Sequence, residues 1–196
     1  MNRRQFLQSG SAFGFVLPLL GHAPYPQWNV YRKRNLFILA SRTDAPSYEL
    51  GRAIAQNLAT HLVRSHAHIA RTPDMGRIAS LLATEQVELA VLPIEIAALM
   101  ADGATPFESY GAIPLTALWK FDPYVLVAHA SMPDHHAYQV TQTLAQYPLE
   151  AEAQALIADN PSVAIATETA ETMLPFEFHP GAIAYLQHRP LPHSHS

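Results

Sequence analysis

The chain has 196 residues, of which 49% are hydrophobic and 14% charged, and it contains no cysteine. This composition predicts a globular protein with one sizeable core, and it excludes disulfides, thiolate metal sites and cysteine nucleophiles. The formal net charge is −4 and no block of like charge occurs, which argues against a nucleic-acid partner.

The N-terminus has the features of an export signal. A pair of arginines is followed by two large apolar residues and then by an apolar run over residues 12–20, which is too short to span a bilayer. The arrangement resembles a twin-arginine signal, which exports folded proteins, and the alternative is a general secretory signal. Either route predicts a periplasmic protein. The residues that carry the signal are Arg3, Arg4, Phe6 and Leu7.

The remaining chain divides into three parts. Residues 24–34 form a basic linker that contains proline, residues 35–188 form one α/β domain, and residues 189–196 are expected to be a disordered tail. Pro24 directly after Ala23 disfavours cleavage at the end of the predicted signal, residues 1–23. An uncleaved signal would tether the protein to the membrane.

Short apolar runs alternate with helical patterns from residue 35 onward. Residues 35–41 predict a strand buried on both faces, residues 66–71 a second short strand, and residues 87–92 a third, buried strand. Two more strands are expected at 113–118 and 124–130. Between them, leucine and isoleucine recur at helical spacing, with Thr72 and Pro73 placed to begin the second helix. Further helices are expected after Pro93, Ser131 and Leu149, and over residues 180–187. The pattern predicts an α/β fold with a parallel or mixed sheet and flanking helices.

Several segments of the chain resemble segments of the TAXI family of solute receptors, which serve TRAP transporters, and they occur along the chain in the same order as in that family. The string FHPGAIAY at residues 178–185 resembles the closing motif of that family, and residues 40–51, with Tyr48 and Gly51, resemble its opening strand, loop and helix. Residues 72–82, 87–93 and 124–144 resemble its second helix, its third strand and its return segment.

The resemblance implies one lobe of a type II periplasmic-binding-protein-like fold. It implies an exported receptor subunit that binds a small organic acid or amino acid without chemistry and meets a transporter membrane subunit. Ligand-binding candidates follow the first two strands, at the edge where open α/β sheets bind ligands. These residues are Ser41, Arg42, Thr43, Ser47, Tyr48 and Thr72. Hydroxyl groups and a guanidinium suit an anionic ligand there, in an open groove flanked by Tyr48 and Thr72.

Two departures from the family pattern support an alternative. The loop between Ser41 and Ser47 contains no glycine, and too few residues separate Leu118 from Tyr124 for a second lobe. Loss of a lobe would expose an apolar face suited to a homo-oligomer or another partner. The alternative function is therefore a periplasmic accessory or interaction module that no longer binds ligand. For the loop itself, the alternative is that Asp44 and Ser47 only cap the helix.

Histidine is common, with 11 copies, but the spacing predicts no metal site or other cofactor. His66 and His68 are expected to share a strand face without a third ligand nearby. Adjacent His135 and His136 point to different faces of a helix, and His179 is expected to begin the last helix and to pack. No nucleophile elbow, phosphate loop or zinc-protease helix occurs, so the chain is expected not to be an enzyme.

Overall fold

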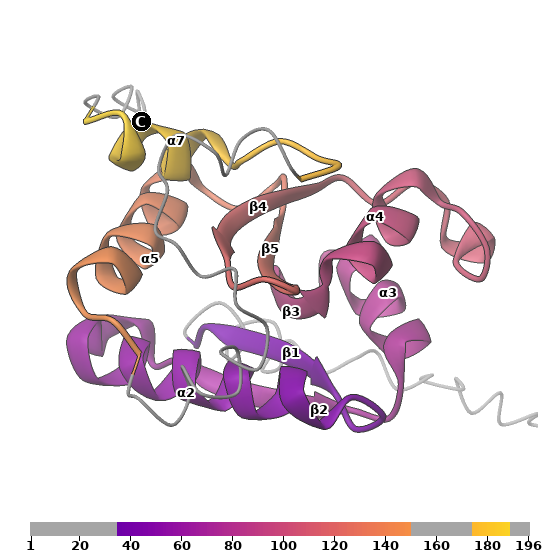
Figure 1. Cartoon of the computed structure of the whole chain (residues 1–196), viewed down its shortest axis with the longest axis horizontal. Coiled ribbons are helices and arrows are strands. Elements are labelled where there is room, and N and C mark those ends of the chain that lie inside the picture. Colours follow the sequence, from indigo (N-terminus) through magenta and orange to yellow (C-terminus); the bar gives the residue numbers. More distant parts are fainter. Residues whose placement is uncertain (1–34, 150–173, 189–196) are drawn as a thin grey trace, which may run out of the picture.

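The computed structural model of the chain describes residues 35–149 and 174–188. These residues form a mixed five-stranded sheet, in the order β2-β1-β3-β5-β4, with helices packed against it (Figure 1). The strands are β1 (Phe37–Ser41), β2 (His68–Thr72), β3 (Leu89–Pro93), β4 (Leu115–Lys120) and β5 (Tyr124–His129). The helices are α2 (Ala45–His61), α3 (Met75–Ala83), α4 (Ile94–Asp102), α5 (Asp134–Gln146) and α7 (Pro180–Leu186), with 3-10 turns η1 (Val63–Ser65) and η2 (Glu108–Tyr110). The predicted α/β class is confirmed.

The first three strands form the parallel half of the sheet, as the sequence predicts. β1 lies between β2 and β3, and its last residue, Ser41, is in register with Thr72 at the end of β2. The four residues that follow Phe37 in β1 are all buried, which is why this strand has no polar alternation.

The second half of the sheet is antiparallel. β5 pairs with β3 on one side and with β4 on the other, in both cases antiparallel, so it is an interior strand. The strand expected at residues 124–130 thus joins the same sheet, but through a hairpin with β4 and not through a crossover connection. Only residues 121–123 separate β4 from β5, and a turn this short can only join antiparallel neighbours. No second lobe is inserted at this point.

The helices cover the sheet from two sides. Figure 1 shows α5 to the left of the sheet, α3 and α4 to its right, and α2 along the bottom, where it packs on β1 and β2. The predicted apolar stripe of α2 is buried, with Leu50, Ile54 and Leu58 at most 1% exposed. Gly51 lets this helix approach closely, because a Cβ there would lie 2.7 Å from Cδ1 of Ile69 on β2.

The C-terminal segment packs back on the domain, as predicted for the FHPGAIAY motif. Phe178 forms a parallel bridge with Ala117 of β4, and α7 packs along α5. His179 is the N-cap of α7: its Nδ1 accepts from the Gly181 amide at 3.2 Å, and its Nε2–H donates to the carbonyl oxygen of Met132 at 3.0 Å. The expected role of His179 in packing and helix initiation is confirmed.

Two local predictions are wrong. Thr72 ends β2 and does not cap α3; Asp74 is the N-cap, and its Oδ1 accepts from the amide of Arg77 at 2.8 Å. A carboxylate one residue from the helix start satisfies that amide, which the more distant threonine cannot reach. His66 has a left-handed backbone (φ 43°) and precedes β2, so it shares no strand face with His68.

Other predictions concern residues outside the described ranges. These are the export signal and linker, residues 1–34, the helix expected after Leu149, and the tail, residues 189–196. Within the described ranges, no helix combines the length and apolar character needed to cross a bilayer.

Candidate functional site

The carboxyl ends of the parallel strands meet at one edge of the sheet, here called the carboxyl edge. Ser41, Thr72 and Pro93 end β1, β2 and β3 there. Tyr124 lies at the same edge because antiparallel β5 begins opposite Pro93. Helices α2, α3 and α4 begin just after these strands, so their N-terminal backbone N–H groups lie near this edge. Two of these groups are already paired: the amide of Arg77 donates to Asp74, and the amide of Ile94 donates to the carbonyl oxygen of Pro123.

The hydroxyl groups predicted to bind a ligand are already engaged within the protein. Ser41 is fully buried, and its Oγ lies 2.7 Å from Oγ1 of Thr43 while also accepting from the Thr43 amide at 3.1 Å. Thr72 is buried, and its hydroxyl lies 3.2 Å from the carbonyl oxygen of Ala40. The hydroxyl of Ser47 donates to the carbonyl oxygen of Asp44 at 2.9 Å. These bonds fix the loop between β1 and α2.

The cationic groups at the same edge are better placed to meet a ligand. Arg42 is exposed, and its backbone N–H donates to the carbonyl oxygen of Thr72 at 2.8 Å, which holds the loop against β2. The guanidinium of Arg71 lies over the Tyr48 ring, 4.5 Å from the ring centroid. A cation–π contact of this kind restrains the arginine without neutralising it. The structure thus brings Tyr48 together with a residue that the sequence analysis did not select.

Sequence reasoning also missed the pair formed by Asp44 and Tyr124. Asp44 is the N-cap of α2 but its side chain makes no capping bond; its Oδ1 instead accepts from the Tyr124 hydroxyl at 3.0 Å. Its Oδ2 is buried and has no hydrogen-bond partner among the described residues. Burial, together with the bond to Asp44 and the charge of Asp44, raises the pKa of Tyr124 to about 12. No sequence pattern links two residues that are 80 positions apart.

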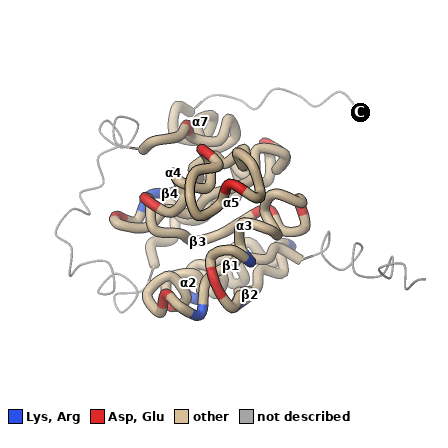
Figure 2. Tube along the Cα trace, turned by 90° about the vertical axis from the view of Figure 1, so that its right-hand side faces the viewer, with Lys and Arg blue, Asp and Glu red and all other residues tan. Residues whose placement is uncertain are grey.

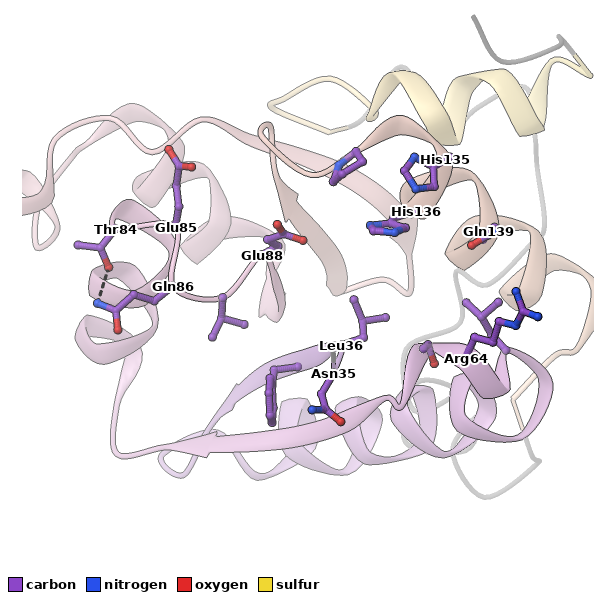
Figure 3. A pocket seen from close by; sticks show the side chains of 15 residues that line it. Asn35, Leu36, Arg64, Thr84, Glu85, Gln86, Glu88, His135, His136 and Gln139 are labelled. Atoms are coloured by element: carbon purple, nitrogen blue, oxygen red, sulfur yellow. Dashed lines mark hydrogen bonds between the residues drawn. The ribbon is translucent and has the colours of Figure 1, made fainter. Parts of the chain in front are cut away.

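A pocket of about 780 Å³ lies at the opposite edge of the sheet, where the parallel strands begin. Its walls come from the start of β1, the end of α2 with η1, the loop before β3, and the first turns of α5 (Figure 3). The groove expected beside Tyr48 and Thr72 stays a prediction, while this amino-edge pocket was not predicted. Its lining residues are spread over four elements, and no local pattern marks them.

Charge is dispersed over the domain. Figure 2 shows lysine and arginine positions interspersed with aspartate and glutamate along the trace, without a long stretch of one sign. In the part of the chain that the structure describes, no three histidine or carboxylate side chains lie close enough together to hold a metal ion. The expectation that His135 and His136 point to different faces is wrong, because their ring centroids lie 4.1 Å apart and both residues line the pocket. Any selectivity for charged ligands must therefore come from individual side chains.

Large exposed apolar side chains are few in the described ranges. Val63, Tyr110 and Tyr147 are 67%, 37% and 43% exposed, and they lie on η1, on η2 and after α5. Single exposed apolar residues are ordinary on protein surfaces. A homo-oligomer formed through an exposed lobe face thus stays a prediction. Comparison with models of protein families and with curated proteins gave no match for this chain.

Proposed function

We propose that the chain is an exported, single-lobed binding protein of the solute-receptor type that takes a small carboxylate at the carboxyl edge. The observation that carries the proposal is the register of Ser41 with Thr72, because it brings the segments that lead into α2 and α3 to the same edge of the sheet. Helix N-termini at this edge favour an anion, and Arg42 and Arg71 add positive charge there. The protein would bind and release its ligand without chemistry, as a subunit that delivers it to a transporter in the membrane.

A second function, an accessory module that binds no small ligand, is favoured by one observation. The carboxylate of Asp44 lies at the same edge: one oxygen accepts from the Tyr124 hydroxyl, and the other has no hydrogen-bond partner in the described part of the chain. A half-buried negative charge at this position opposes a carboxylate ligand. The hydroxyls of Ser41 and Thr72 would also have to break existing bonds to contact it.

Ligand-dependent stabilisation separates the two functions. The full chain is unfolded with heat in the presence of succinate, glutamate and larger organic acids. A ligand at a hundred times its dissociation constant should raise the free energy of unfolding by about 2.7 kcal/mol. The variant Arg71→Gln should weaken that ligand about tenfold, because a hydrogen-bonded charge is lost. Arg52→Gln is the matched control, since Arg52 is exposed on α2 and pairs with Glu49.

A panel in which no acid stabilises the chain would leave the accessory module as the better account. Stabilisation that Arg71→Gln and Arg52→Gln reduce equally would remove the carboxyl edge as the binding site, even if the protein remains a binding protein.

A further inference from the structure

The amino-edge pocket carries opposite charges on its two walls. Glu85 and Glu88, in the loop before β3, form one wall. Arg64 of η1, with His135 and His136 of α5, forms the other. Figure 3 shows Glu88 facing the α5 histidines across the pocket, with Leu36 between Glu88 and Arg64. The volume of about 780 Å³ falls within the range of small-molecule sites.

Two charged groups on these walls, Glu88 and Arg64, lack a partner within the described residues. In residues 35–149 and 174–188, no ion pair or side-chain hydrogen bond joins either Glu88 or Arg64 to another group. Burial, and then the charge of Glu85, raise the pKa of Glu88, and no cation among the described residues opposes this shift. A ligand that brings a cation to this wall would stabilise the charged form of Glu88.

The floor between the walls is apolar. Leu36, Leu62 and Val87 line the pocket together with the charged groups, and they lie just before β1, just after α2 and in the loop before β3. An apolar floor between two charged walls suits a molecule with charges at its ends and methylene groups in the middle.

We infer that the amino-edge pocket binds a small zwitterion whose amine and acidic group are separated by an apolar chain, such as an ω-amino acid. The amine pairs with Glu88, the acidic group pairs with Arg64 and accepts hydrogen bonds from the α5 histidines, and the methylene chain contacts Leu36. The site is separate from the proposed carboxyl-edge site, which lies at the other end of the strands, and does not depend on it.

The test uses the full chain and two ω-amino acids, 4-aminobutyrate and 6-aminohexanoate, in calorimetric titrations. Hexanoate lacks the amine and hexylamine lacks the acid, so each should bind about tenfold more weakly than 6-aminohexanoate or not at all. Glu88→Gln keeps the shape of the side chain but removes its charge, and should weaken 6-aminohexanoate about tenfold. Arg64→Gln should do the same, and since Arg64 is exposed this variant tests the site even if Glu88→Gln folds poorly. Glu177→Gln, an exposed residue near β4, is the control and should bind as the wild type does.

Three results would overturn the inference. In the first, neither ω-amino acid binds. In the second, the wild type and both pocket variants bind 6-aminohexanoate equally well. In the third, hexylamine binds as tightly as 6-aminohexanoate. Binding of ω-amino acids at the amino-edge pocket does not depend on the carboxyl-edge proposal. A carboxylate bound at that edge should leave the affinity for 6-aminohexanoate unchanged, and Arg71→Gln should not affect it.

Discussion

The hydroxyl of Tyr124 donates a hydrogen bond of 3.0 Å to Oδ1 of Asp44, from the start of β5 to the residue that precedes α2. Since β3 lies between β1 and β5 in the sheet, the bond reaches across the end of β3. It ties the parallel half of the sheet to the antiparallel half at the carboxyl edge.

Replacing Tyr124 by phenylalanine should destabilise the domain. The change leaves both oxygens of the Asp44 carboxylate without a donor in the described structure, and an unsatisfied, partly buried acceptor costs about 1–3 kcal/mol. Denaturant unfolding of wild type and variant measures the difference. Tyr138→Phe is the control, because Tyr138 contacts the Tyr185 ring edge-on and makes no hydroxyl hydrogen bond in the described structure. An equal loss in both variants would show that the bond to Asp44 contributes nothing.

The same pair predicts a loss of stability at high pH. The pKa of Tyr124 is raised to about 12, so the folded protein holds this proton above pH 10, the ordinary tyrosine value, where the unfolded chain releases it. The stabilisation is complete below about pH 10 and is lost as the pH rises toward about 12. Absorbance of the phenolate follows the titration, and Tyr124→Phe should remove the transition with the highest midpoint. If the variant keeps that transition, another tyrosine is responsible for it.

His179 predicts a loss of stability on mild acidification. Burial lowers the pKa of His179, although the charge of Asp134 and the bond to Met132 oppose the shift. Below about pH 6.5 the unfolded chain therefore binds the proton more readily, and stability present above this pH is lost as the pH falls. His129 and His136, whose pKa values burial also lowers, act in the same direction.

The variant His179→Asn isolates that contribution. Asparagine is a good N-cap but does not titrate, so the free energy of unfolding should depend less steeply on pH between about 7 and 5. His188→Asn serves as the control, because His188 is exposed and asparagine tolerates its positive φ of 53°. A wild-type slope in His179→Asn would contradict the assignment.

Alanine at Gly181 would meet backbone atoms, whereas alanine at Gly51 would meet the end of a side chain, so the two variants should differ in stability. A Cβ at Gly181 would collide with the carbonyl oxygen of Asp134, so Gly181→Ala must push α7 away from α5 and should cost about 1–3 kcal/mol. At Gly51 the nearest atom is the end of the Ile69 side chain, which can rotate. Gly51→Ala should therefore cost less in the same unfolding measurement. A larger loss of unfolding free energy for Gly51→Ala than for Gly181→Ala would mean that α7 can shift relative to α5 more easily than the Ile69 side chain can move.

Export gives a prediction about residues before the described domain. Changing Arg3 and Arg4 to lysine keeps both charges but removes the guanidinium groups that a twin-arginine pathway reads. The double variant should accumulate inside the cell, as measured by fractionation and blotting. Normal export would instead identify a general secretory signal, which depends on charge and tolerates lysine.

Sequence reasoning located most elements because local patterns mark them. Buried runs such as residues 37–41 are apolar throughout, and the stripe from Leu50 to Leu58 has helical spacing. Strand direction was not fully predictable. A short turn after Lys120 indicates a hairpin, yet the insertion of β5 between β3 and β4 depends on packing of the whole sheet.

The sites were harder to predict than the fold. The sequence predicts that Asp44 caps the helix, because aspartate is common at that position. In the structure its carboxylate accepts instead from the hydroxyl of Tyr124, which only the folded sheet brings near. From the sequence, Arg71 is expected to be a solvated strand residue. In the structure its guanidinium lies over the ring of Tyr48. The amino-edge pocket has no sequence signal either, because its two charged walls come from loops and helices that are distant in the chain.

The C-terminal segment is held in place by contacts of its own. Phe178 bridges Ala117, the amide of Ala117 donates to the carbonyl oxygen of Glu177 at 2.9 Å, and the ring of His179 holds the carbonyl oxygen of Met132. These non-covalent contacts, and not the covalent connection through residues 150–173, therefore set the position of the C-terminal segment. A protease cut within that link would leave two fragments that stay associated through β4, α5 and α7, and the nicked protein should migrate as one species until it is denatured.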